Sequence, residues 1–209
     1  MFTSIERIES VGPDARARRI FFADGSPARV TSAAAVRLLG LEVGREVEPD
    51  QVLGALATNE PQLARDRALQ LLGYRERSSQ ELTQRLHRDG YPDGIVDEVV
   101  SRFCEVELVD DRRFASAWIR SRVSAGYGLR RIKRELREKG VADDVVEDAV
   151  VESELEDELL RARAALRGRA PRDSKEREKL VRRLVGRGFD LRVAVDAVGP
   201  VPPADSSDT

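Results

Sequence analysis

The sequence predicts a mainly α-helical protein, in which tandem three-helix repeats form an elongated array after a small N-terminal α+β module. Three observations predict this: an internal repeat of about 50 residues, apolar residues at helical spacing, and an unusual composition. Charged residues make up 35% of the 209 residues and aromatic residues only 5%, whereas soluble domains are usually about 25% charged. Such a composition favours narrow hydrophobic cores inside a large solvated surface.

Three glycines mark the internal repeat, and offsets of 50 and 48 residues separate Gly90, Gly140 and Gly188. In the first copy Leu82 and Leu86 precede the glycine, four residues apart and therefore on one helix face. The glycine is expected just after the helix end, where a left-handed conformation costs it little. An apolar residue follows it, and a second short helix is expected to begin near an acidic residue. The apolar residues are Tyr91, Val141 and Phe189, and the acidic ones are Asp93, Asp143 and Asp190.

A further helix upstream completes each repeat, and it is expected at residues 63–72, 112–123 and 158–166. Ser78 and Glu81 fit a capping box at the start of a helix, and an aspartate of the pair Asp110 and Asp111 should cap the first helix of the second repeat. Gly126-Tyr127-Gly128 is expected to break the helix that follows, and Pro171 and Asp173-Ser174 have the corresponding role in the third repeat. The predicted repeats span residues 60–109, 110–155 and 156–199.

Residues 1–59 have a different pattern, which predicts a small α+β module with a β-hairpin, about three strands and two helices. Residues 4–8, 18–22 and 28–30 are short β-like runs, and Asp24-Gly25 is a strong turn signal. Thr31 is expected to cap a helix that ends at Gly40, and a second helix should run from Pro49-Asp50 to about Ala57. The tail, residues 200–209, is rich in Pro, Ser and Asp and should be disordered.

Cysteine and histidine counts exclude several kinds of site. The single cysteine, Cys104, allows no internal disulfide and suits a reducing cytoplasm. With one histidine, His87, no Cys/His zinc site can form. The first ten residues lack the apolar segment of a secretory signal, and no stretch approaches the ~20 apolar residues that span a bilayer. We therefore expect a cytoplasmic protein with no metal, no cofactor and no membrane contact.

No catalytic apparatus is visible, so the chain is not expected to be an enzyme. It contains no phosphate-binding Walker loop, no GxGxxG and no HExxH. Asp110 and Asp111 are interpreted as helix caps, and His87 as a surface residue on a polar helix face. Cys104 is expected in the core because it occupies an apolar helical position. Phe114 and Trp118, four residues apart, are expected in the core of the second repeat.

Several motifs of the first two repeats together resemble the RecX family. They are Ala68-Leu69-x-x-Leu72, Arg77-Ser78-Ser79-x-Glu81-Leu82, Leu108-Val109-Asp110-Asp111-x-Arg113-Phe114-Ala115 and Gly128-x-x-Arg131-Ile132-x-x-Glu135-Leu136-x-x-Lys139-Gly140-Val141. The resemblance covers residues 64–150 firmly and extends weakly to Val198. Each motif alone is weak, but the spaced set is fairly specific. The N-terminal module is similar to an extension found on some members.

The resemblance implies a regulatory protein that binds RecA and its filament on single-stranded DNA. Such proteins lie along the filament groove and inhibit filament extension, ATP hydrolysis and strand exchange, and so modulate DNA repair and the SOS response. We expect RecA and its nucleoprotein filament as partners and a monomeric chain, and weak contact with single- or double-stranded DNA stays open.

Charge is distributed in blocks, although the net charge is only -2. Residues 112–140 contain ten bases and two acids, residues 141–160 nine acids and no base, and residues 161–192 twelve bases and four acids. Ten bases against two acids is too unbalanced for pairing alone, so two interpretations stay open: the block contacts phosphates or an acidic protein groove, or it is a solvated helix surface with Arg–Glu pairs. Tyr127 either fills the loop between two glycines or stacks on a partner or base. The predicted contact residues are Arg112, Arg113, Arg120, Arg122, Tyr127, Arg130, Arg131, Lys133, Arg134 and Arg137.

Two other classes of protein are weighed against the filament regulator. A helix-turn-helix-like protein would bind one duplex DNA site tightly without RecA, whereas the regulator would prefer RecA-coated single strands. A nuclease would need metal-dependent cleavage that a chelator abolishes.

Overall fold

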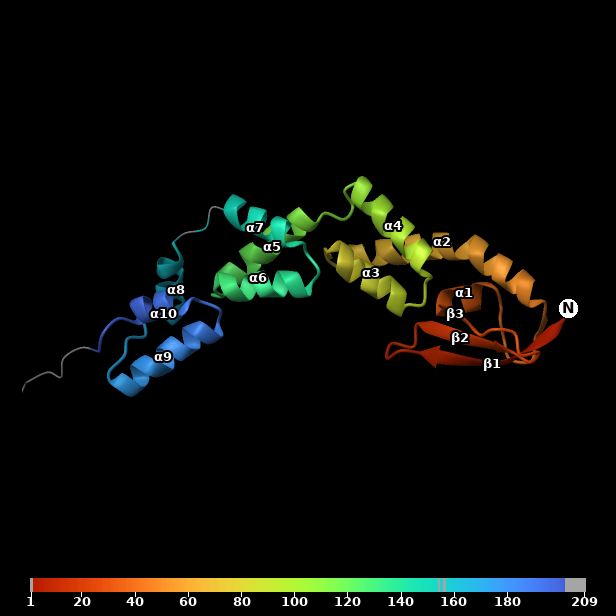
Figure 1. Cartoon of the computed structure of the whole chain (residues 1–209), viewed down its shortest axis with the longest axis horizontal. Helices are drawn as coiled ribbons and strands as arrows, with labels where there is room; N and C mark the ends of the chain where they lie inside the picture. The colour runs from red at the N-terminus through yellow and green to blue at the C-terminus, as the bar shows by residue number, and fades with distance from the viewer. Residues whose placement is uncertain (1, 154, 156, 202–209) are drawn as a thin grey trace, which may run out of the picture. The chain divides into compact units, whose positions relative to one another are not determined.

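The computed structural model describes residues 2–153, 155 and 157–201 and contains two compact units, Met1–Asp110 and Asp111–Thr209 (Figure 1). Helices dominate both units, and strands occur only in the first among the described residues. The expected mainly helical fold with a small N-terminal strand module is confirmed. The predicted tail lies outside the described residues from 202 onward.

The N-terminal module is a four-stranded antiparallel sheet in the order β3-β2-β1-β4. Its strands are β1 (Thr3–Val11), β2 (Ala17–Phe22), β3 (Arg29–Ser32) and β4 (Glu46–Val47). The fourth strand was not predicted, because two residues are too few to show an alternating pattern. Ile5, Ile20 and Phe22 pack with Leu56 of the following helix in one buried cluster.

Helix α1 (Ala33–Leu38) begins one residue later than expected, because Ser32 and not Thr31 is its cap. The Ser32 hydroxyl accepts a hydrogen bond from the Ala35 amide at 3.1 Å. Thr31 lies fully buried in β3, and its hydroxyl donates to Oε1 of Glu60 at 2.5 Å. Both residues are good caps by type, so the sequence pattern does not distinguish them.

Two helices predicted at about residues 50–57 and 63–72 are one helix, α2 (Pro49–Tyr74), which contains Pro61. A proline removes one backbone donor and usually breaks a helix. Here the neighbouring Glu60 is fully buried and binds Thr31 and Arg29 of β3, which fixes this part of the helix against the sheet. The predicted division between residues 59 and 60 therefore falls inside a continuous helix.

The first repeat adds α3 (Ser79–Arg88) and α4 (Asp93–Glu105) to the C-terminal part of α2. Ser78 caps α3 as predicted and accepts from the Glu81 amide at 3.1 Å. Gly90 has the predicted left-handed conformation, with φ +95°, and a Cβ there would approach the Thr31 carbonyl oxygen to 2.5 Å. A side chain is therefore excluded at Gly90 by contact with the sheet as well as by backbone strain.

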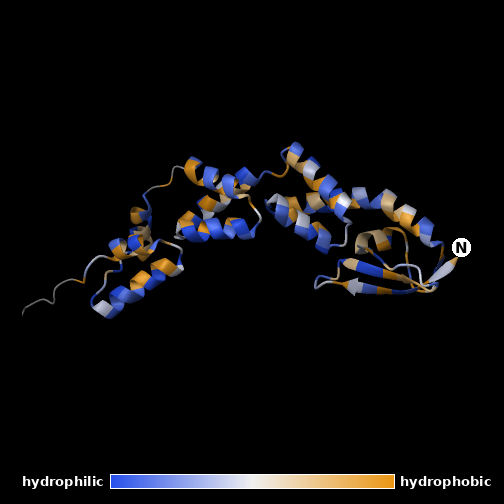
Figure 2. Cartoon of the chain, viewed as in Figure 1, coloured by the Kyte–Doolittle hydropathy of each residue, from blue (hydrophilic) through white to orange (hydrophobic). Residues whose placement is uncertain are grey.

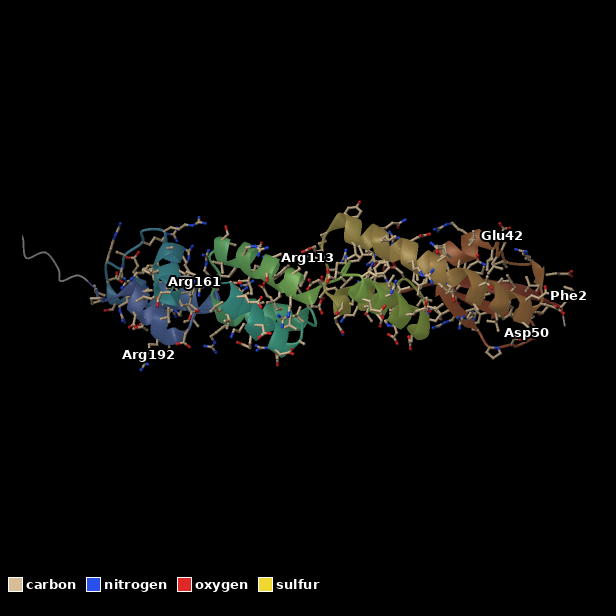
Figure 3. The ribbon with its side chains drawn as sticks, turned by 90° about the horizontal axis from the view of Figure 1, so that it is seen from above. Phe2, Glu42, Asp50, Arg113, Arg161 and Arg192 are labelled. Carbon is tan, nitrogen blue, oxygen red and sulfur yellow. The ribbon has the colours of Figure 1, made fainter. Side chains whose placement is uncertain are left out.

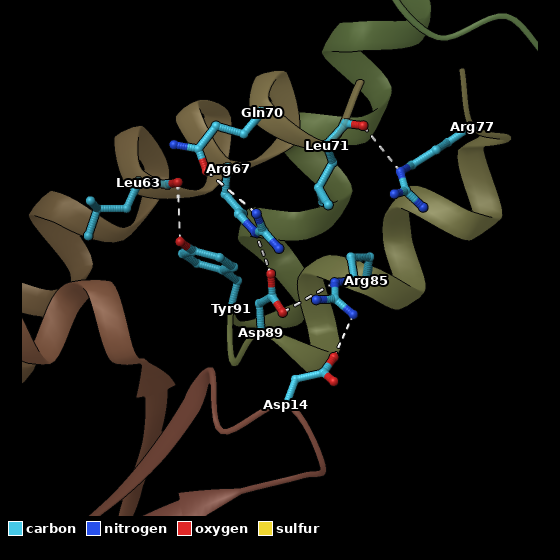
Figure 4. Close-up of polar contacts among 9 residues, drawn as sticks. All are labelled: Asp14, Leu63, Arg67, Gln70, Leu71, Arg77, Arg85, Asp89 and Tyr91. Carbon is cyan, nitrogen blue, oxygen red and sulfur yellow. Dashed lines mark hydrogen bonds and ion pairs between the residues drawn. The ribbon is translucent and has the colours of Figure 1, made fainter. Parts of the chain in front are cut away.

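Buried polar contacts hold the turn after α3 in place (Figure 4). The Tyr91 hydroxyl donates to the Leu63 carbonyl at 3.2 Å, and Arg67 binds the nearly buried Asp89 at 2.6 Å. Arg85 joins the turn to the sheet module through Asp14. Burial is the main cause that raises the pKa of Tyr91.

Cys104 is exposed, so the prediction that it packs in the core is wrong. The buried residues of α4 are Val96, Val99, Val100 and Phe103, which form one stripe at helical spacing. Cys104 follows Phe103 by one residue, about 100° further round the helix, and so lies beyond the edge of that stripe.

The second unit contains two further three-helix bundles. One comprises α5 (Asp111–Ser124), α6 (Leu129–Glu138) and α7 (Asp143–Glu152), and the other α8 (Glu158–Leu166), α9 (Ser174–Gly186) and α10 (Leu191–Val198). Each has its own buried cluster, and hydrophilic and hydrophobic residues alternate along the helices (Figure 2). The expected left-handed glycines are present, with φ +76° at Gly140 and +92° at Gly188.

Backbone hydrogen bonds join the second and third repeats. The Gly128 amide donates to the Arg187 carbonyl at 3.0 Å, and the Arg130 amide donates to the Gly188 carbonyl at 3.1 Å. A Cβ on Gly128 would lie 2.3 Å from the Phe189 nitrogen. The glycine at the start of α6 is therefore needed for the close approach of the two repeats.

Candidate partner-binding surface

The ten predicted contact residues lie on α5, on the following loop and on α6. Two α6 residues, Ile132 and Leu136, are fully buried, and Leu129 packs against the same cluster, as predicted. Most of the arginines of this block keep part of their side chains in solvent. Whether they contact a partner depends on which acids surround them.

The acidic third helix of the repeat, α7, packs against α5 and α6 and neutralises much of the basic block. Arg112 binds Asp148 at 2.7 Å and Glu152 at 3.3 Å. Lys133 pairs with Glu147, and Arg137 with Asp143 and Glu147. The basic residues of 112–140 are therefore paired more extensively than the acids of that range alone allow, because α7 supplies further carboxylates.

Three of the remaining predicted residues, Arg120, Arg130 and Arg134, are less neutralised. Arg120 is exposed and has no ion pair among the described residues. Arg130 lies 3.7 Å from Asp190, and Arg134 lies 3.4 Å from Glu138. These last two pairs are exposed at both ends, and such pairs contribute little to stability.

Glu135 organises the centre of the surface. Its carboxylate accepts from Nε of Arg122 and from Nε of Arg131, both at 2.8 Å, and from the Trp118 indole nitrogen at 3.1 Å. Burial opposes its ionisation, but the hydrogen bond from Arg131 and the charge of Arg122 hold the pKa of Glu135 below its usual range. Both arginines bind Glu135 through Nε, and about a third of each arginine side chain stays exposed.

Aromatic rings and cations alternate around Glu135. The Arg122 guanidinium lies over the Trp118 ring at 4.2 Å from its centroid, and Arg131 lies over Tyr127 at 4.4 Å. Trp118 also packs near Phe114, with ring centroids 5.9 Å apart. Phe114 is buried as predicted, whereas Trp118 and Tyr127 are only half-buried. Ring stacking of this kind fixes the arginine side chains in a defined orientation.

The sequence prediction gave no role to a set of arginines in the third repeat. Arg163, Arg167, Arg169 and Arg182 are exposed, Arg183 is half-buried, and none of them has an ion pair among the described residues. Figure 3 shows many nitrogen-tipped side chains around α8, α9 and α10, including that of Arg192. Residues 161–192 contain twelve bases and four acids, so the sequence does indicate a basic surface here. The ratio of bases to acids is nevertheless lower than in residues 112–140.

The described residues show no group of three or more His, Cys, Asp or Glu side chains that could hold a metal ion. His87 is partly exposed and lies 3.2 Å from Asp93 through Nδ1. No helix in the described part of the chain is long and apolar enough to cross a membrane.

Tandem three-helix bundles, each with its own buried cluster, define a helical repeat protein. Family models place the chain within this class. Residues 64–103 match the model described as "RecX, first three-helix domain", and residues 110–150 match "RecX, second three-helix domain".

The chain belongs to the RecX family of regulatory proteins. The regulatory protein RecX of Mycolicibacterium smegmatis is 36% identical over 165 residues, which cover 72% of this chain and 88% of the relative. The regulatory protein RecX of Halorhodospira halophila is 41% identical over 129 residues, which cover 60% and 80% of the two chains.

Solved structures show the same fold. The crystal structure of RecX from Lactobacillus salivarius aligns with a TM-score of 0.61 at 20% identity, over 68% of this chain and 96% of the other. A second crystal structure of a regulatory protein RecX aligns with a TM-score of 0.57 at 21% identity and covers 91% of this chain and 96% of the other.

Proposed function

We propose that this chain binds RecA and the filament that RecA forms on single-stranded DNA, and that it inhibits filament extension and ATP hydrolysis. It would thereby modulate recombination, DNA repair and the SOS response in the cytoplasm. The observation that carries this proposal is the similarity to regulatory RecX proteins along more than two thirds of the chain. The chain acts as a monomer in this proposal and needs no cofactor.

The surface around Glu135 is our proposed contact with RecA. Tryptophan, tyrosine and arginine are the residue types that most often dominate binding energy in protein interfaces, and three predicted contact residues, Arg122, Tyr127 and Arg131, gather here. Glu135 and the two rings hold the guanidinium groups in place before any partner arrives. Such preorganisation lowers the entropic cost of binding.

Binding of the purified chain to RecA filaments assembled on single-stranded DNA with a slowly hydrolysed ATP analogue tests this proposal. The double variant R122Q and R131Q should bind about tenfold or more weakly, since arginine anchors in interfaces contribute about 1–2 kcal/mol or more each. The matched control is R112Q and R137Q, which removes two arginines that pair with α7. Equal binding by both variants would overturn the proposed surface, and no filament binding by the unaltered chain would overturn the function.

The alternative, a helix-turn-helix-like protein that reads one duplex sequence, makes a different prediction in the same assay. It requires tight binding to a duplex site without RecA. In α6 two of the long side chains that such a helix would present, Lys133 and Arg137, bind acids of α7. This pairing favours the regulator over the duplex reader.

A further inference from the structure

Strand β1 of the N-terminal module has an edge that β4 covers only at one end. The strand is nine residues long, but β4 pairs only with Thr3 and Ser4. Beyond Ile5, whose amide donates to the Arg45 carbonyl at 3.0 Å, no strand pairs with this side of β1 in the described part of the chain. Figure 1 shows β1 on the outer side of β2, away from β3. The backbone of residues 6–10 therefore has an open edge.

A bulge in β1 decides which side chains of this segment face the core. The pairing of β1 with β2 shifts register between Ile5 and Arg7, and the extra residue of a bulge changes the face on which the following side chains lie. Ile5 is buried, and Ile8 packs against the same cluster. Arg7 and Glu9 instead form an ion pair at 3.2 Å, with their side chains 55% and 47% exposed. The open edge therefore has an isoleucine on its core face and an arginine and a glutamate on its outer face.

The charges along this edge are complementary to themselves. Charged side chains usually prevent an open edge from pairing with another strand. They do so only where like charges meet, because opposite charges across an antiparallel pair stabilise it. The side chains follow in the order Glu6, Arg7, Ile8, Glu9 and Ser10. When Ile8 lies opposite Ile8 of a second, antiparallel copy, each Arg7 lies opposite a Glu9.

Neighbouring registers lack this complementarity. Registers shifted by two residues keep the same faces together, but they place Arg7 opposite Arg7 or Glu9 opposite Glu9. A shift of one residue places Ile8, from the core face, opposite a charged side chain of the outer face. Registers shifted further toward the N-terminus meet β4, which occupies the edge beside Thr3 and Ser4. Charge and burial therefore both favour the antiparallel register centred on Ile8.

We propose that two copies of this chain pair through residues 6–10 of β1 and form a reversible dimer with one continuous sheet. The same segment of both copies makes the contact, as a two-fold axis requires. A short strand pair is a small contact, and contacts below about 1,200 Å² are typically weak, so the dimer forms at high protein concentration. The inference goes beyond the proposed function, because the monomer that acts on the filament is in equilibrium with this dimer of the free chain.

Sedimentation equilibrium of the full chain without RecA or DNA, from low micromolar to near-millimolar concentration, tests the inference. The unaltered chain should show a reversible equilibrium between monomer and dimer. The variant R7E places a glutamate opposite Glu9, and E9R places an arginine opposite Arg7. Because each variant turns both attractive pairs into repulsive ones, the dissociation constant of the dimer should rise about tenfold or more.

Mixing the two variants gives the sharpest result. One variant has two acids at the edge and the other two bases, so an equimolar mixture should form heterodimers at least as readily as the unaltered chain forms dimers. The double variant R7E with E9R exchanges the two charges within one chain and should restore self-association.

The matched control is R37E, which makes the same change of charge as R7E at an exposed residue of α1. This helix packs against β2 and β3, so R37E should leave the dimer unchanged. Thermal unfolding by circular dichroism checks that each variant folds, because R7E also removes the contact of the Arg7 guanidinium with the Phe21 ring.

Hydrogen exchange locates the contact, because amides within residues 6–10 should exchange more slowly at high than at low protein concentration. Three results would overturn the inference: a monomer at every concentration, a dimer that R7E and E9R weaken no more than R37E does, or a mixture of the two variants without heterodimers. The second result would assign the dimer contact to another surface. None of these results bears on whether the chain binds RecA, because RecA is absent.

Discussion

A methyl group added at Gly128 should loosen the joint between the second and third repeats. Gly128 has φ -82°, which alanine adopts freely, so the variant G128A introduces no backbone strain of its own. Its Cβ would lie 2.3 Å from the Phe189 nitrogen and 2.4 Å from the Gly188 carbonyl oxygen. Both neighbours are backbone atoms, which cannot move aside as a flexible side chain can.

The size of the effect follows from two ways of relieving the clash. Keeping the joint closed costs about 1–3 kcal/mol of overpacking. Opening it loses the hydrogen bonds from Gly128 to Arg187 and from Arg130 to Gly188, each worth about 1 kcal/mol. Both routes lead to a loss of about 2 kcal/mol in the free energy that holds the third repeat on the second.

Hydrogen exchange measured by mass spectrometry, combined with chemical denaturation, reads this effect. Amides at the start of α6 and in the turn after α9 should exchange about 30-fold faster in G128A, since 1.4 kcal/mol corresponds to a factor of ten. The control is G186A, because a Cβ at Gly186 meets nothing within 4 Å, and its stability should be unchanged or slightly raised. Unchanged exchange and stability in G128A would refute the reasoning.

Three further perturbations test other parts of the structure. E60A should lower the free energy of unfolding by about 3 kcal/mol in urea titrations, because it removes the fully buried acceptor of Thr31; R65A, which breaks an exposed pair, should change it by less than about 0.5 kcal/mol. The pKa of Glu135 is lowered in the fold, so the stability that its carboxylate contributes is present above the unfolded pKa of about 4.3 and is lost as pH falls through the folded pKa. The variant E135Q should therefore lose less thermal stability in acid than the unaltered chain. An identical acid profile in the two proteins would count against the Glu135 network. The pKa of Tyr91 is raised in the fold, so the stability that its neutral hydroxyl contributes is complete below about pH 10 and is lost as pH rises further. The variant Y91F should therefore lose less stability in alkali than the unaltered chain. A parallel decline of the two proteins would contradict this.

Periodicity predicts the helices well because the same three-helix pattern occurs three times. Gly90, Gly140 and Gly188 have the expected left-handed conformation, and the apolar residue after each is buried. These features are local: each depends on a few neighbouring residues and on the backbone freedom of glycine.

Features that depend on tertiary contacts were predicted less well. Two separate helices were expected before and after residue 60, but Glu60 is buried against the sheet, and this contact supports one continuous helix. Cys104 is apolar and adjacent to Phe103, yet it faces solvent because the core of the repeat covers only one stripe of α4. Local patterns carry no information about which surface a partner element covers.

The contact surface was only partly predictable for the same reason. Counting charges along the chain located the basic block of the second repeat, but it did not show that α7 folds back and pairs with Arg112 and Arg137. The cluster around Glu135 joins residues that are 17 positions apart, such as Trp118 and Glu135. Spacing in the sequence cannot show these contacts, because they depend on the angle at which α5 and α6 cross.

Titration of RecA's single-stranded-DNA-stimulated ATPase with the purified chain tests the central claim most directly. The account predicts inhibition at less than one molecule of this chain per RecA subunit, because a regulator bound to the filament acts on many subunits. R122Q with R131Q should shift the titration to higher concentrations, whereas R112Q with R137Q should not. An ATPase rate that stays unchanged up to a molar excess of the unaltered chain would contradict the account.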